Sequence, residues 1–524
     1  MSKKNIHAAG QLNKNFSPYF YQSYTLPQQV KARFPKLNIT YPTPAFTREE
    51  GHFTTQEELM KFLYELSADT EHMQLEIIGN SLEGREIPMV IFTTNKDEEE
   101  MKDKPTVWLQ ANVHGHEPAS GESALVIIHQ LAKEALGEEI LPYVNVVVVP
   151  RINPDSVFYH EQKSPLRING NRDHVQLEMP ELQALHQAYN RFEAEVVIDA
   201  HEYDADIAYP HVGKEGALKY HDLLILSGKN LNIPAEIRLK SDEWFLPDVF
   251  SALDAEGISN GTYFTVSHTE NNEVVVHEGG GDIGIGRNAF ALKPSFCFLT
   301  ESLGISIGRE NFLRRVTSQV ITHTSILRTT KKYAAEIKTL IAEAKLELVD
   351  QAAHGEENRS IVLQSEAQEM EGLTVEAVDI ATGDVIEIPV TYYDETEAVP
   401  TLERKLPNAY LLPPAYQWLI ERLVMQGVVV DRLVEEEVLT VECYDVHKIS
   451  GKCEQLNIET EIVEREVRFP KGSYVISCAQ RAGSLIALAL EPESSYSFVS
   501  KNYFHVEAGE EVPIYRYLGE THTL

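Results

Sequence analysis

The sequence predicts an α/β fold, a largely parallel sheet covered by helices on both faces, followed by a β-rich domain of α+β type. Between residues 75 and 300, short apolar runs of strand length alternate with amphipathic stretches of helical period. After residue 359 the pattern changes to closely spaced β-prone runs, which predict the second part.

The elements follow from these patterns in chain order. Apolar runs predict strands at 75–78, 107–113, 144–149, 196–198 and 296–299. Apolar positions at helical spacing predict helices at 124–136, 180–192 and 217–231, and a longer helical stretch at 309–348. In the C-terminal part, strands are expected at 374–378, 385–393, 438–444, 461–469, 474–478 and 484–490, with one helix at 416–426.

Three segments result from this division. Residues 1–50 form an N-terminal extension, 51–350 the α/β domain and 356–524 the β-rich domain. The boundary is the stretch 352–359, which is polar, contains glycine and has no apolar period.

The charge balance is strongly acidic. The chain of 524 residues has 46 Lys and Arg against 80 Asp and Glu, a formal charge of −34. Residues 351–524 hold 31 acidic and 13 basic residues, so the excess is densest in the C-terminal part. Such a surface repels phosphate backbones and anionic lipid, so we expect no nucleic-acid and no membrane partner.

The cysteines and the N-terminus predict the compartment. Four cysteines without a CxxC pair fit a reducing compartment better than a disulfide framework. The N-terminus has two lysines but no apolar stretch behind them, so it does not read as a signal peptide. We therefore expect a cytoplasmic protein, or a secreted one if a signal peptide has been trimmed.

Three predicted strands end on residues that can bind a metal. His114-Gly-His-Glu117 follows the strand 107–113, Asp199-Ala-His201 follows 196–198, and Glu301 follows 296–299. The carboxyl ends of parallel strands lie at one edge of a sheet, where functional groups gather. Two histidines and one carboxylate complete the protein half of a catalytic zinc site. His114 is favoured over His116 as the ligand because it has the x-x spacing to Glu117.

These motifs occur in the order of a known family. His114-Gly-His-Glu117, Asn153-Pro154-Asp155, Asn171-Arg172, Asp199-Ala-His201 and Glu301 resemble the zinc carboxypeptidases of the M14 family over residues 50–330. The resemblance implies an eight-stranded mixed sheet between helices and one Zn²⁺ per chain. It also implies hydrolysis of the C-terminal amino acid of a peptide.

The family pattern implies a role for each matching residue. His114, Glu117 and His201 match the zinc ligands, and Glu301 matches the catalytic glutamate that acts as general acid and base. A carboxylate within reach of the attacking water can take its proton and return it to the leaving amine.

The substrate-binding residues follow from the same resemblance. Asn171 and Arg172 match the pair that holds the terminal carboxylate of the substrate, and Arg167 is the nearest candidate for the arginine that polarises the scissile carbonyl. The glycine-rich stretch 278–288 is expected to form a wall of the substrate pocket. Within it, Arg287 would favour an acidic side chain at the end of the substrate.

Two departures from the family pattern concern the surroundings of the site. Asn169 stands where the family has a carboxylate that supports a zinc histidine, and an amide accepts from an imidazole N–H less strongly. The tyrosine that caps the substrate has no clear match. Phe290 occupies the first position to examine and Tyr263 the second.

Two other functions remain open at this point. One is a zinc amidase or N-acyl-amino-acid deacylase of the aspartoacylase-like branch, which uses the same metal ligands. The other is a catalytically silent protein that binds peptide ends, although the intact Glu301 argues against it. In each case the partner is a peptide or small amide with a free carboxylate. The sequence specifies neither the oligomeric state nor the amino acid released.

Overall fold

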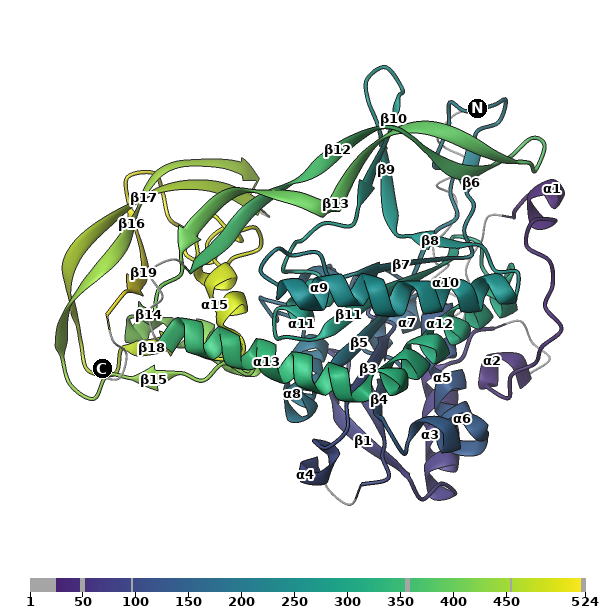
Figure 1. Cartoon of the computed structure of the whole chain (residues 1–524), viewed down its shortest axis with the longest axis horizontal. Helices are drawn as coiled ribbons and strands as arrows, with labels where there is room; N and C mark the ends of the chain where they lie inside the picture. The colour runs from purple at the N-terminus through teal and green to yellow at the C-terminus, as the bar shows by residue number, and fades with distance from the viewer. Residues whose placement is uncertain (1–24, 48–51, 96–97, 354–358, 453–454, 520–524) are drawn as a thin grey trace.

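The fold is described from a computed structural model of the chain, which describes residues 25–47, 52–95, 98–353, 359–452 and 455–519. Within these ranges the central feature is an eight-stranded sheet (Figure 1). Its strands are β1 (Met73–Asn80), β2 (Glu86–Phe92), β3 (Thr106–Ala111), β4 (Asn145–Val149), β5 (Val196–Asp204), β7 (Leu223–Ser227), β8 (Asn260–Thr262) and β11 (Phe296–Ile305).

The strand order is β1-β2-β4-β3-β5-β11-β7-β8. The inner pairs β4–β3, β3–β5 and β5–β11 are parallel, whereas β1–β2, β2–β4 and β11–β7 are antiparallel. The prediction of a mixed, largely parallel eight-stranded sheet is confirmed. β3, which His114 follows, and the strands that contain His201 and Glu301 are neighbours at its centre. β5 and β11 continue past the predicted ends at residues 198 and 299, so His201 and Glu301 lie within their strands.

Helices cover both faces of this sheet. On one face, Thr300 of β11 donates a hydrogen bond to Gln319 of α12. On the other face, Cys297 of β11 and Phe290 of α11 lie in the core. No described helix is long and apolar enough to cross a bilayer. The helices up to residue 353 are α1 (Gln28–Lys31), α2 (Pro44–Thr47), α3 (Gln56–Ala68), α4 (Glu98–Met101), α5 (Pro118–Lys133), α6 (Ala135–Ile140), α7 (Pro154–Tyr159), α8 (Pro180–Phe192), α9 (Ala235–Lys240), α10 (Leu246–Ala255), α11 (Gly286–Ala291), α12 (Phe312–Lys332) and α13 (Ala334–Ala353).

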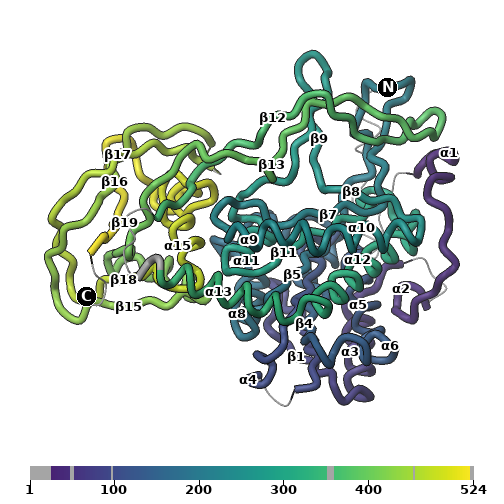
Figure 2. The backbone as a smooth tube through the Cα atoms, in the orientation of Figure 1, coloured from purple at the N-terminus to yellow at the C-terminus, as the bar shows by residue number. Residues whose placement is uncertain are grey.

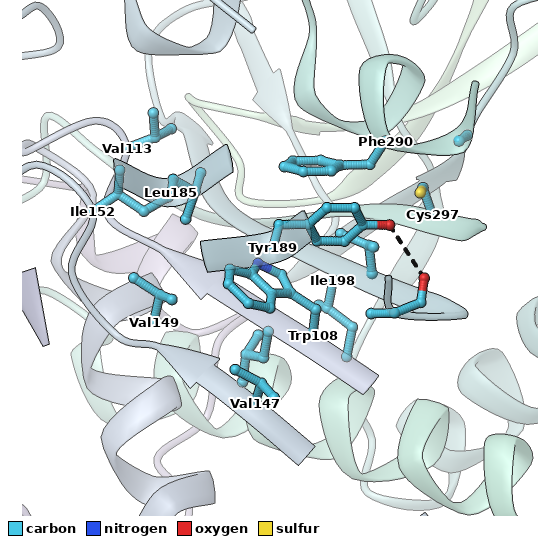
Figure 3. Close-up of a cluster of buried hydrophobic side chains, with 14 of the residues drawn as sticks. Trp108, Val113, Val147, Val149, Ile152, Leu185, Tyr189, Ile198, Phe290 and Cys297 are labelled. Carbon is cyan, nitrogen blue, oxygen red and sulfur yellow. Dashed lines mark hydrogen bonds between the residues drawn. The ribbon is translucent and has the colours of Figure 1, made fainter. Parts of the chain in front are cut away.

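The core under the site is aromatic. Trp108 of β3 meets Tyr189 of α8 edge to face at 5.5 Å, and Tyr189 lies 4.5 Å from Phe290 between ring centroids (Figure 3). All three side chains are fully buried. Large rings contribute much apolar area to a core, so this cluster holds β3, α8 and α11 together.

The N-terminal extension is attached to the α/β domain. Of the predicted segment 1–50, residues 1–24 and 48–50 lie outside the described residues. The described part contacts Glu122 of α5, whose carboxylate accepts from Thr43 at 2.5 Å and from the Ala45 backbone N–H at 3.2 Å.

The helix predicted at 217–231 is wrong. The structure has strand β6 (Ala217–Lys219) and strand β7 there. Every residue of β7 is buried between β11 and β8. A central strand covered on both faces is apolar throughout, so its sequence cannot be told from a buried helix by period alone.

The described residues form two further sheets: one combines strands from before residue 280 with strands from after residue 359, and the other lies wholly after residue 408. One has the order β6-β12-β13-β10-β9 and the other β15-β18-β14-β19-β16-β17. Their strands are β9 (Phe264–His268), β10 (Val274–Glu278), β12 (Ser360–Asp379), β13 (Val385–Lys405), β14 (Ala409–Leu412), β15 (Asp431–Arg432), β16 (Glu437–Lys452), β17 (Gln455–Phe469), β18 (Tyr474–Ser477) and β19 (Glu511–Tyr517), and the helices are α14 (Gln417–Met425) and α15 (Gly483–Leu490).

The strand predicted at 484–490 is also wrong, because this segment is α15. All eight of its residues are buried, so the helix is apolar on every side. Its Leu and Ala residues favour a helix, and Ile486 is the one β-branched residue in the run.

The two predicted domains share a sheet and a core. The long ribbon of β12 and β13 extends from the C-terminal lobe over the α/β domain, where β12 pairs with β6 and β13 with β10 (Figures 1 and 2). One hydrophobic cluster contains buried residues of both parts. The predicted boundary at 352–359 lies mostly outside the described residues, and the division itself stays a prediction.

Candidate active site

The sheet register brings two of the candidate residues together. In the parallel pair β5–β11, His201 lies opposite Glu301. Residues paired across neighbouring strands point to the same face, so these two side chains are neighbours. His114 enters from the loop after β3, which is the other parallel neighbour of β5.

His114, Glu117 and His201 form one compact buried group. Their ligand atoms all lie within 4.8 Å of one another. The Glu117 carboxylate is 2.7 Å from His114 Nδ1 through Oε1 and 3.0 Å from His201 Nδ1 through Oε2. The structure thus brings together the three residues that the sequence proposes as metal ligands.

The loop between β3 and α5 positions the first two ligands. A Cβ at Gly115 would stand 1.9 Å from the carbonyl carbon of Ser156, so only glycine allows this approach. Asn112 has φ 52° and donates its amide N–H to the Glu117 carbonyl at 2.7 Å. Glu117 itself directly precedes α5, whose first residue is Pro118.

Three side chains orient the two imidazoles. Asn169 Oδ1 lies 2.8 Å from His114 Nε2, and Asp199 Oδ2 lies 3.2 Å from His201 Nε2. Asn171 Nδ2 is a further 3.2 Å neighbour of His201 Nε2. With Nε2 engaged on both rings, the Nδ1 atoms face the centre of the group, as metal-binding histidines require.

Burial and charge act against each other at the carboxylates. Burial tends to raise the pKa of Glu117, but His114 and His201 outweigh it and hold this pKa well below its ordinary value. For Glu301 burial dominates and raises the pKa to about 8, partly opposed by His201. Glu301 Oε2 is buried and has no hydrogen-bond partner among the described residues.

The donor set fits Zn²⁺. Two imidazole nitrogens and one carboxylate are the ligands of many catalytic zinc sites, with a fourth position kept for water or substrate. All three donors are buried, and each histidine has an outer partner that fixes its orientation. His116 is outside this group, and burial lowers its pKa to about 4.

The two predicted carboxylate binders differ in availability. Arg172 is exposed, and its Nη1 donates to the Asn171 carbonyl at 2.6 Å. Asn171 is buried: its Oδ1 accepts from the Gly286 N–H at 2.8 Å, and its Nδ2 lies near His201. The amide of Asn171 is therefore engaged in holding α11 against β5.

The other two predicted arginines differ in burial. Arg167 has φ 65°, its side chain is 76 % exposed, and it pairs with Glu161 at 2.9 Å. Arg287 is buried in α11, where its Nη2 donates to the Gly280 carbonyl at 2.7 Å. Burial lowers the pKa of Arg287. The roles proposed for both arginines stay predictions.

Two further residues lie near Glu301: Tyr263, the second position considered for the capping tyrosine, and Lys219, which the sequence did not mark. Tyr263 directly follows β8 and is partly buried. Its pKa is raised mainly by burial and in second place by the negative charge of Glu301. Lys219 of β6 donates to the Phe264 carbonyl at 2.7 Å, and burial lowers its pKa to about 8 while Glu301 opposes this. Phe290, the first position considered for a capping tyrosine, is fully buried in the core.

Nothing in the local sequence marked Lys219 as part of the site, and Tyr263 was considered only as the second choice for a capping tyrosine. Lys219 comes from the segment predicted as a helix, and Tyr263 follows the short strand β8. Both belong to the edges of the five-stranded sheet: Lys219 lies in β6, and Tyr263 directly precedes β9.

The sheet, the buried donor triad and the adjacent glutamate define the class of protein: a zinc-dependent hydrolase. Comparison with known proteins agrees. The family model for zinc carboxypeptidases of the M14 family matches residues 59–176. Carboxypeptidase 2 of Trichophyton rubrum is 30 % identical over 511 residues, covering 94 % of this chain and 93 % of the relative.

Two further similarities were found. Carboxypeptidase 2 of Trichophyton equinum is 30 % identical over 508 residues, covering 93 % of each chain. A metallo-carboxypeptidase structure from Burkholderia cenocepacia aligns with a TM-score of 0.42 and 16 % identity, over 53 % of this chain and 70 % of that one. The chain belongs to the M14 family of zinc carboxypeptidases. It is a metallocarboxypeptidase, its cofactor is zinc and its substrates are peptides.

Proposed function

We propose that the chain removes the C-terminal amino acid from peptides, with His114, Glu117 and His201 holding one Zn²⁺ and Glu301 as the general acid and base. The observation that carries the proposal is the register of β5 and β11, which pairs Glu301 with His201. Bound to this group, Zn²⁺ supplies a Lewis acid that activates water at neutral pH and polarises the scissile carbonyl.

Glu301 moves the proton. Its Oε2 is buried without a partner among the described residues, so it is available to accept a proton from the attacking water. Burial raises its pKa, which makes the protonated form a competent donor to the leaving amine. Asp199 and Asn169 keep the two imidazoles in place throughout.

Arg172 binds the terminal carboxylate of the substrate. Its side chain is exposed, and its Nη1 donates a hydrogen bond to the Asn171 carbonyl, which orients the guanidinium plane. A fork of this kind matches a carboxylate and selects chain ends over chain middles. Asn171 and Arg287 are proposed to support this site, with Arg287 favouring an acidic side chain.

Metal removal tests the first part of the proposal. We expect a chelator to abolish peptidase activity and one equivalent of Zn²⁺ per chain to restore it. The three buried donors hold the ion, and no side chain among them can supply its Lewis acidity. Zinc content by atomic absorption and activity are measured together. The variant Glu117→Gln should lose both, whereas activity that persists in metal-free protein would contradict the proposal.

Replacing the arginine tests the second part. In Arg172→Gln we expect KM for an N-blocked dipeptide ending in Leu to rise about 100-fold, because a charge-assisted bidentate contact is lost. Zinc content should stay at the wild-type level. The exposed Arg468, which pairs with Glu436 in the C-terminal lobe, offers the control Arg468→Gln. An unchanged KM in Arg172→Gln would remove this residue from the substrate site.

A further inference from the structure

Tyr496, in the segment between α15 and β19, has an unusual backbone conformation. Its φ is 61°, a left-handed value that is costly for a bulky aromatic residue. The conformation is held by Gln176, whose Nε2 donates to the Tyr496 carbonyl at 2.6 Å. Strained residues of this kind are maintained where the surrounding structure requires a side chain in one place.

The Tyr496 side chain is directed at Arg172. Burial raises the pKa of Tyr496, and a side-chain hydrogen bond with the Arg172 guanidinium opposes this rise. The ring packs on Gly284, where a Cβ would stand 2.5 Å from Tyr496 Cδ1 and 3.0 Å from the Arg172 carbonyl. Arg172 thus donates from Nη1 to the Asn171 carbonyl, and its own carbonyl lies next to the Tyr496 ring at Gly284.

Arg172 and Tyr496 line the same cavity, of about 730 Å³, between the two parts of the chain. Lys163, Arg167 and Lys501 also line it, so four cations face this space in a chain of net charge −34. The two acids of its wall are engaged. Asp173 accepts two backbone N–H groups and Glu178 accepts from the Tyr503 hydroxyl. The cavity therefore suits an anionic group.

We propose that Tyr496 is a positioning residue for substrate binding: the C-terminal part of the chain, through this tyrosine, holds the Arg172 guanidinium in the orientation that accepts the terminal carboxylate of a peptide. The proposal rests on the role of Arg172 given above. It assigns to the β-rich lobe a direct part in recognition of the substrate, because Tyr496 lies 324 residues from Arg172 along the chain.

Kinetics of the zinc-loaded full chain test this role. In Tyr496→Phe we expect KM for an N-blocked dipeptide ending in Leu to rise about tenfold, the effect of one hydrogen bond to a charged group. The value of kcat should stay within about twofold, because Glu301 and the zinc ligands are untouched. Tyr393→Phe is the matched control: it removes a hydroxyl of the C-terminal part that also bonds to a glutamate, Glu369, but lies outside the residues that line this cavity, and it should keep the wild-type KM.

The double variant separates this proposal from the one on which it rests. If Tyr496 acts through Arg172, Tyr496→Phe should raise KM no further in the Arg172→Gln background. An unchanged KM in Tyr496→Phe, with a raised KM in Arg172→Gln, would overturn the role of Tyr496 alone. Equal rises in Tyr496→Phe and Tyr393→Phe would also overturn it, because they would indicate general loosening of the C-terminal part.

Discussion

Glu301→Gln is expected to lose peptidase activity by a factor of about 10³ to 10⁴ while it keeps one zinc per chain, since general acid–base catalysis contributes up to about this much. The exchange keeps the shape of the side chain and removes its ability to take up a proton. Glu301 is opposite a zinc ligand in the register but is itself outside the donor group, so metal binding should survive.

The measurement is kcat/KM together with metal content on the same samples. Glu273→Gln, an isosteric change of an exposed residue in the turn between β9 and β10, should behave as wild type. Activity within about tenfold of wild type in Glu301→Gln would exclude the residue as the proton-transfer group.

Arg315→Met is expected to lower the free energy of unfolding by about 3 to 5 kcal/mol, because it leaves a buried carboxylate without its charge partner. Arg315 of α12 reaches Glu202 with Nε at 2.7 Å and Nη2 at 3.0 Å, and both side chains are nearly inaccessible to solvent. Glu202 follows the ligand His201 and also accepts from the Ala119 N–H at 2.8 Å, near the ligand Glu117. This ion pair therefore ties the two ligand-bearing segments to α12.

Urea unfolding measures the loss. Arg328→Met on the same helix is the control, because Arg328 pairs with Glu139 at the surface with a 58 % exposed side chain. Surface pairs contribute about 0 to 1 kcal/mol, so this variant should stay close to wild type. A loss below about 1 kcal/mol in Arg315→Met would mean that Glu202 finds another partner.

The metal-ligand group could be predicted from the sequence because its members lie directly after apolar runs. In a parallel sheet, strands that are neighbours end at one edge, so adjacency to a run gives a position in space. The structure confirms the central position of the three strands, and His114 follows β3, but His201 and Glu301 lie within β5 and β11, which continue past the apolar runs. Their chemical roles rest on the family pattern and stay proposals.

The elements predicted wrongly share one property. The strand at 223–227 and the helix at 483–490 are both buried on all sides. Where every residue is apolar, no period distinguishes strand from helix, and the neighbours in the fold decide. β7 is a strand because β11 and β8 offer it two edges.

The sequence by itself determined the fold class and a set of candidate zinc ligands with an adjacent candidate base, since these depend on local pattern and on strand ends. Only the tertiary structure decided the surroundings: the burial of Arg287, the exposure of Arg167, the bond of Lys219 to the Phe264 carbonyl and the shared cavity of Tyr496 and Arg172. The physical reason is sequence separation. Contacts between residues hundreds of positions apart are set by the packing of whole elements, here a C-terminal lobe against the site, and leave no local signal.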